Sequence, residues 1–103
     1  MQLIQIFIPI FDNEGQRFSQ SNFDGIRRQL VERFGGMTAF VQSPALGLWK
    51  DTQRGETAWD DVILIEVMVD AVDREWWSAY RTELEQIFRQ DEILVRVIAC
   101  ERV

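Results

Sequence analysis

The hydrophobic and polar positions of this chain repeat one pattern twice: an apolar strand, an amphipathic helix and a second apolar strand. The first unit comprises QLIQIFIPI (2–10), SNFDGIRRQLVERF (21–34) and GGMTAFVQ (35–42). The second comprises DVILIEVMVD (61–70), DREWWSAYRTELEQIF (73–88) and EILVRVIA (92–99). Alternation with period two is typical of strands, and spacings of three and four are typical of helices. The pattern therefore predicts four strands and two helices.

Both predicted helices have one apolar side and recognisable ends. We expect Ser21 or Asn22 to cap the start of the first helix, and Gly35-Gly36 to end it in a left-handed conformation. Asp73 is a good cap for the second helix. The apolar sides comprise Phe23, Ile26, Leu30 and Phe34 in the first helix, and Trp76, Trp77, Tyr80, Leu84, Ile87 and Phe88 in the second.

The two long strands are apolar on both faces, although not equally. One face of each is wholly β-branched and should contact the helices: Ile4, Ile6, Ile8 and Ile10 in the first strand, and Ile63, Ile65, Val67 and Val69 in the third. The other faces are apolar with single polar insertions, Gln5 and Glu66. A sheet surface that faces water is polar at most positions. We therefore expect the second face to be covered as well.

Connection rules predict how the elements are arranged. Each β-α-β crossover should be right-handed, and two such units joined give a ferredoxin-like βαββαβ sandwich. This is an α+β fold with a four-stranded antiparallel sheet of order 4-1-3-2 and both helices on one face. Residues 1–103 form one domain of this kind, and Gln5, Glu66 and Arg96 lie near the middle of the uncovered face.

The uncovered face predicts a partner. A patch that contains Leu3, Phe7, Leu64, Met68 and Ile98 would exceed what a monomer normally exposes. A second copy of the chain is the simplest cover. We therefore expect a homodimer formed through the sheet face.

Composition and charge argue against several classes of binding partner and several cellular locations. The 103 residues include 11 Lys and Arg against 17 Asp and Glu, a net charge of −6, which disfavours nucleic acids and anionic membranes. No apolar run approaches the roughly 20 residues of a membrane span. The N-terminus has no basic region or cleavage site and is interpreted as a strand. A single cysteine, Cys100, fits a reducing cytoplasm.

The absence of histidine removes most familiar catalytic and metal centres. Ser-His-Asp and Cys-His systems and nearly all common zinc sites require an imidazole. No phosphate-binding glycine motif follows a strand. The acidic residues Asp51, Glu56, Asp60 and Asp61 fit no calcium loop and are interpreted as a solvated loop. Cys100 is interpreted as a small apolar filler. We therefore expect no cofactor and no metal.

The remaining candidates lie on the uncovered sheet face. If a partner covers Glu66, desolvation would raise its pKa toward the range of a general acid or base. Alternatively, Glu66 pairs with Arg96 or bonds to Gln5 as a buried polar anchor of the dimer.

Two classes of function stay open. The first is a homodimeric domain without catalysis, in which the sheet face is purely an interface. The second is a cofactor-independent enzyme or ligand-binding protein with a pocket for a small apolar or aromatic ligand on the sheet face. In that case Glu66 would act as acid or base and Arg96 would bind an anion. The ligand would contact Gln5, Phe7, Trp49 and Met68.

A long connection separates the second and third strands. SPALGLWKDTQRGETAWD (43–60) is punctuated by Pro and Gly, and a short strand is expected around residues 46–50. Connections of this length are usually functional or make contacts. Trp49 and Trp59 flank it, either in loop and interface packing or along a ligand pocket.

The architecture resembles that of the dimeric α/β-barrel proteins, in which two sheets pack face to face and often enclose a pocket. Small monooxygenases and isomerase-like enzymes belong to that superfamily. Three segments, RFGGMTAF, GLWKD and IFRQDEILV, also resemble a family of small bacterial proteins of unassigned activity, whose secreted members begin with a signal peptide. The second resemblance depends on Arg33, Phe34, Gly36, Thr38, Gly47, Trp49, Phe88 and Gln90. It implies the same fold and no mechanism.

Overall fold

The structure is a computed structural model that describes residues 1–42, 50–51, 56–57 and 62–103. The elements in these ranges are, in order, β1 (Gln2–Pro9), α1 (Gln20–Phe34), β2 (Thr38–Gln42), β3 (Lys50–Asp51), β4 (Glu56–Thr57), β5 (Val62–Val69), α2 (Arg74–Ile87) and β6 (Val95–Ala99). The short strands β3 and β4 pair with each other in antiparallel orientation.

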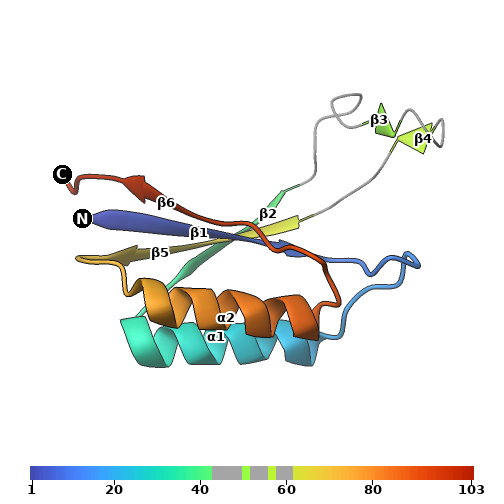
Figure 1. The fold of residues 1–103 in the computed structure, drawn as a ribbon, viewed down its shortest axis with the longest axis horizontal. Coiled ribbons are helices and arrows are strands. Elements are labelled where there is room, and N and C mark those ends of the chain that lie inside the picture. Colours follow the sequence, from blue (N-terminus) through green and yellow to red (C-terminus); the bar gives the residue numbers. More distant parts are fainter. Residues whose placement is uncertain (43–49, 52–55, 58–61) are drawn as a thin grey trace.

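The four long strands form one antiparallel sheet in the order β2-β5-β1-β6. Since β5 and β6 are the third and fourth predicted strands, this is the order 4-1-3-2 read from the opposite edge, and the prediction is confirmed. Both helices lie side by side on one face of the sheet (Figure 1). No helix among the described residues covers the other face.

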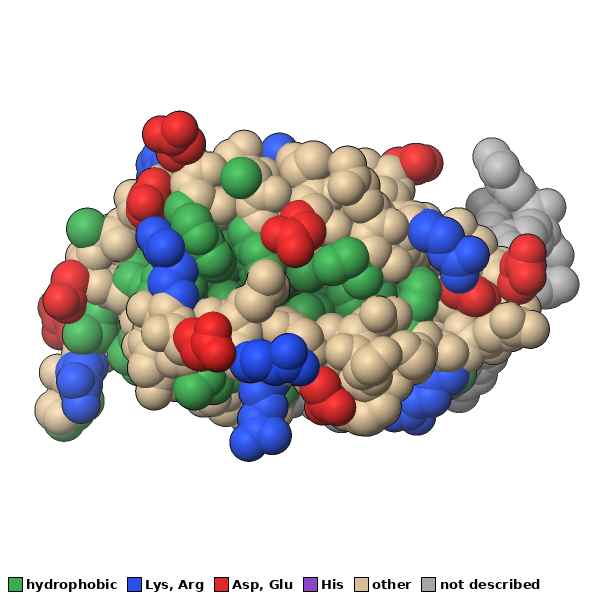
Figure 2. Space-filling model, turned by 90° about the horizontal axis from the view of Figure 1, so that it is seen from below, with side chains coloured by type: hydrophobic (Ala, Val, Ile, Leu, Met, Phe, Trp, Pro, Cys, Tyr) green, Lys and Arg blue, Asp and Glu red, His purple; other side chains and the backbone are tan. Residues whose placement is uncertain are grey.

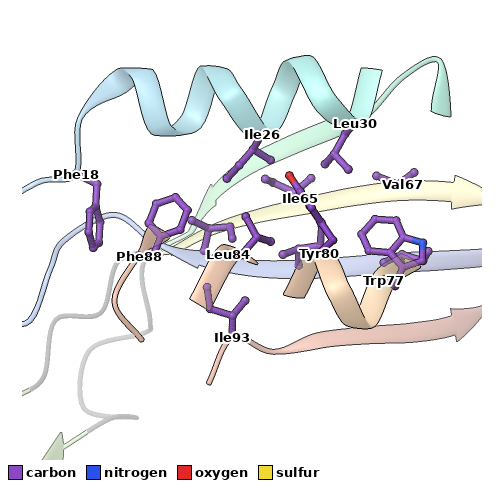
Figure 3. Close-up of a cluster of buried hydrophobic side chains, with 13 residues drawn as sticks. Phe18, Ile26, Leu30, Ile65, Val67, Trp77, Tyr80, Leu84, Phe88 and Ile93 are labelled. Carbon is purple, nitrogen blue, oxygen red and sulfur yellow. The ribbon is translucent and has the colours of Figure 1, made fainter. Parts of the chain in front are cut away.

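The core lies between the helices and the sheet. Ile4, Ile6 and Ile8 of β1 are completely buried there, as the β-branched row predicted. Figure 3 shows side chains from both helices and from β5 meeting in this layer. The cluster also contains Phe18, Ile26, Leu30, Ile65, Val67, Trp77, Tyr80, Leu84, Phe88 and Ile93. Burial of this apolar surface is the main favourable contribution to folding.

Two of the three predicted helix caps are confirmed by the structure. Gly35 has a left-handed backbone (φ 80°), and its N–H donates to Val31 O at 2.8 Å. The Asp73 carboxylate accepts from the N–H of Trp76 at 3.1 Å. The prediction of Ser21 or Asn22 as the first cap was wrong, because α1 begins after Ser19, whose backbone is extended. Neither described helix is long and apolar enough to cross a membrane.

Candidate functional site

A row of polar residues crosses the uncovered face of the sheet from one edge to the other. Thr38 of β2 is paired with Glu66 of β5, Glu66 with Gln5 of β1, and Gln5 with Arg96 of β6. Residues directly opposite one another in antiparallel strands have neighbouring side chains on the same face. The row therefore places a hydroxyl, a carboxylate, an amide and a guanidinium next to one another in that order.

Hydrogen bonds join the last three members of the row. Gln5 Nε2 donates to Glu66 Oε2 at 2.7 Å, and Arg96 Nε donates to Gln5 Oε1 at 2.6 Å. A carboxylate only accepts and a guanidinium only donates, so the two neighbours fix the orientation of the Gln5 amide. Gln5 is 8% exposed, and its burial strengthens both bonds. The row is thus a charge pair connected through a neutral amide.

The sequence predicted which residues meet here, and the geometry shows how. Glu66 was expected to pair with Arg96 or to bond to Gln5, and it bonds to Gln5. Thr38 was not among the predicted site residues. Its position could have been found from the strand order, because the second strand lies next to the third and its first polar residue pairs with Glu66.

Apolar residues border the polar row on both sides. On one side Leu3 is paired with Met68 and Ile98, and on the other Phe7 is paired with Leu64. Phe7 N also donates to Leu94 O at 3.1 Å. Met68 (54%), Leu94 (48%) and Ile98 (41%) are well exposed, whereas Leu64 is buried within the single chain. The predicted apolar patch is present, except that Leu64 contributes little exposed surface.

Phe7 connects the apolar and polar parts of this face. The Arg96 guanidinium carbon lies 4.9 Å from the centroid of the Phe7 ring. A cation over an aromatic face is attracted by the negative face of the ring. Arg96 is therefore held from two directions, by the ring and by the Gln5 carbonyl. Among the predicted ligand contacts, Gln5, Phe7 and Met68 share this face.

Several other residues singled out in the sequence lie wholly or partly outside the described part of the chain. Trp49, Trp59, Asp60 and Asp61 lie outside the described residues, as does most of the short strand expected at 46–50. Lys50 of that range lies in β3. Cys100 follows β6 and is half-buried, and its N–H donates to Met1 O at 3.2 Å.

The opposite side of the molecule has a groove between the two helices. Figure 2 shows an apolar band bordered by acidic and basic side chains on this face. The groove has a volume of about 430 Å³ and is lined by Gln29, Glu32, Arg33, Trp76, Ala79, Tyr80 and Glu83. The Arg33 guanidinium lies 4.5 Å from the centroid of the Trp76 ring and pairs with Asp73 at 3.4 Å. Arg33 therefore covers part of the aromatic floor.

Tyr80 connects this groove to the core. Its ring stacks on Trp76 at a centroid distance of 4.9 Å, and it is 3% exposed. Figure 3 shows its oxygen pointing toward α1. Within the described part of the chain, the Tyr80 hydroxyl has no hydrogen-bond partner. Burial, followed by the nearby Glu83 carboxylate, raises the pKa of Tyr80 above its ordinary value of 10.0.

We expect the ionisation of Tyr80 to destabilise the folded chain only at high pH. Above pH 10 the unfolded chain loses this proton while the folded chain keeps it, so the free energy of unfolding should fall by up to about 1.4 kcal/mol per pH unit. Below pH 10, Tyr80 contributes no pH dependence. It is the only tyrosine, so an ultraviolet titration of tyrosinate reports this group alone. A titration midpoint near 10.0 in the folded protein, or the same alkaline slope in Tyr80→Phe, would contradict the prediction.

Comparisons with known proteins identify the fold. No protein-family model matches the sequence, and no curated protein is significantly similar to it. A phage SAM lyase in its apo state is similar in structure, with a TM-score of 0.61 and 12% identity over 94% of this chain and 78% of that one. The same kind of enzyme in complex with S-methyl-5'-thioadenosine gives 0.58 and 13% identity, over 94% and 79%. At such identities the likeness concerns the fold alone.

Proposed function

We propose that this chain is a single domain, residues 1–103, that functions as a cytoplasmic homodimer in which the uncovered sheet faces pack against each other. The observation that supports this most is the composition of that face. Exposed Met68, Leu94 and Ile98 surround a polar row whose hydrogen bonds are already formed in one protomer. This is the face-to-face arrangement of the dimeric α/β-barrel proteins, which the sequence resembles in architecture.

Physical reasons favour a second sheet as the cover. Packed sheets lie about 10 Å apart, and the interdigitated side chains of their inner faces fill the space between them. Large apolar side chains on either side of the row supply that filling. The polar row brings no isolated charge into the interface, because Glu66 and Arg96 are both bonded to Gln5 within each protomer.

The mass in solution tests this proposal. Size-exclusion chromatography with light scattering should give a species of twice the 12.1 kDa chain mass. The measurement should be repeated over a tenfold dilution, because an interface that buries an apolar face persists at low concentration. A species of 12.1 kDa at all concentrations would contradict the homodimer.

A second candidate is a ligand-binding protein or enzyme whose pocket lies at this same interface. The similarity to phage SAM lyases favours it, since that fold supports a small enzyme that binds S-methyl-5'-thioadenosine. Here Glu66 would attract a cationic centre or act as acid or base, and Arg96 would bind a carboxylate. SAM carries both kinds of group, a sulfonium cation and a carboxylate. Gln5, Phe7, Trp49 and Met68 would then contact the ligand.

Calorimetric titration distinguishes the two candidates. If the face is a binding site, the protein binds SAM or S-methyl-5'-thioadenosine, and Glu66→Gln weakens the binding of SAM by about tenfold or more, which corresponds to about 1.4 kcal/mol. Glu83→Gln is the matched control, because Glu83 lies at the helix groove on the other side of the molecule. Binding that is absent, or equal in wild type and Glu66→Gln, would leave the interface role alone.

A further inference from the structure

The polar row has a direction. Glu66 and Arg96 are paired to Gln5 from opposite sides, in β5 and β6 respectively. Neighbouring strands are about 4.8 Å apart, so the negative and positive residues lie at similar distances on either side of Gln5. The face therefore has acid on one side of β1 and base on the other.

This direction limits how two copies can stack. If the two-fold axis runs along β1 at Gln5, Glu66 of each protomer faces the partner's Arg96. If the axis runs along the row, Glu66 faces the partner's Glu66 and Arg96 faces the partner's Arg96. Both arrangements keep the strands of the two sheets aligned, which is one of the two ways in which sheets pack face to face. Only the first brings opposite charges together, whereas the second buries two pairs of like charges.

The apolar rows also fit the first arrangement. An axis along β1 keeps each position along the strand, so the row that contains Leu3, Met68 and Ile98 meets the same row of the partner. The row that contains Phe7 likewise meets its own copy. Apolar side chains therefore contact apolar side chains on both sides of the polar row.

The charged groups retain bonding capacity for a partner. The bond to Gln5 uses Nε of Arg96, one of five guanidinium N–H donors. The Glu66 carboxylate receives the Gln5 amide at Oε2, and a carboxylate accepts several hydrogen bonds. Gln5 fixes the position of both groups before a second copy arrives, which reduces the cost of ordering them.

We infer that the second copy docks with the two-fold axis along β1 at Gln5, so that each Glu66 pairs with the partner's Arg96. This inference depends on the proposed homodimer, since it specifies how that dimer is built. The interface contains two equivalent ion pairs, one on each side of the axis. The order Glu66–Gln5–Arg96 thus makes the face complementary to itself in one orientation.

A chain with the two charges exchanged tests this geometry. In the double variant Glu66→Arg and Arg96→Glu, the Gln5 amide can reverse and bond both new neighbours, so the network within the protomer is kept. The variant should dimerise with itself as the wild type does. Mixed with wild type, it should fail to form heterodimers, because acid would face acid and base would face base.

Native mass spectrometry of mixed chains supplies the readout, with one chain labelled with ¹⁵N because the exchange leaves the mass unchanged. Control mixtures of labelled and unlabelled identical chains give the random share of heterodimers. The wild-type and exchanged chains should give a share about tenfold lower. A share equal to the control or above it overturns the inferred axis, as does an exchanged chain that stays monomeric. A monomeric wild type overturns the homodimer itself, and this geometry with it.

Discussion

Replacing Met68 with aspartate should convert the proposed dimer into a folded monomer. Met68 is 54% exposed in the protomer, so the substitution removes little packing from the fold. In the proposed dimer the new carboxylate would be buried against apolar side chains without a cation to pair with it. We expect the dimer dissociation constant to rise at least about 100-fold, which corresponds to about 2.7 kcal/mol. Analytical ultracentrifugation over a range of concentrations measures this constant.

Val31→Asp provides the control for this experiment. Val31 of α1 is also apolar and well exposed (41%), but it lies in the helix layer on the other side of the sheet. The Val31→Asp substitution changes the net charge by the same amount and should leave the dimer dissociation constant unchanged. A Met68→Asp chain that remains dimeric, or two variants that dissociate equally, would contradict the proposed interface.

Phe88→Ala should destabilise the protein more than any surface substitution. Phe88 follows α2 and is completely buried, with its ring centroid 4.9 Å from that of Phe18 and 5.6 Å from that of Phe23. Removal of a buried phenylalanine side chain loses its transfer free energy and leaves a cavity, at a cost of about 3–5 kcal/mol. Urea denaturation followed by tryptophan fluorescence measures the free energy of unfolding.

The same substitution at Phe11 shows how much of the effect depends on burial of the side chain. Phe11 lies after β1 and is 36% exposed. Phe11→Ala should change the free energy of unfolding by about 0.5 kcal/mol or less, as substitutions away from the core usually do. Equal decreases in the free energy of unfolding at the two positions would mean that the buried packing of Phe88 does not contribute more to stability than the exposed Phe11.

The fold could be predicted largely because its strands and helices have distinct hydrophobic periods. The β-branched rows of β1 and β5 identified the buried face, and the two crossovers then left one strand order. The start of α1 could not be predicted, because three polar residues capable of capping follow one another closely. The extended backbone of Ser19 decides between them, and the Ser21 hydroxyl lies 2.8 Å from that of Ser19.

The sequence predicted which residues form the candidate site, but not which of them are bonded to each other. Alternation along the strands placed Gln5, Glu66 and Arg96 on one face, and the strand order placed Gln5 on the strand between the other two. Only the register shows that Gln5 lies directly opposite both charged residues. Register depends on how the whole sheet packs, and a shift of one residue would reverse every face. The groove beside Tyr80 could not be predicted, because it depends on the distance between two helices.

Arg96 also has a consequence for solubility. The strand β6 lies at an edge of the sheet, and VRVIA contains no other charge. An exposed, apolar edge strand can pair with another chain and start aggregation, and a central charge is one of the devices that prevent this. A substitution that reverses the sign of the charge keeps this protection. Replacing Arg96 with an apolar residue leaves five apolar residues along the edge, so aggregation would accompany the loss of the bond to Gln5.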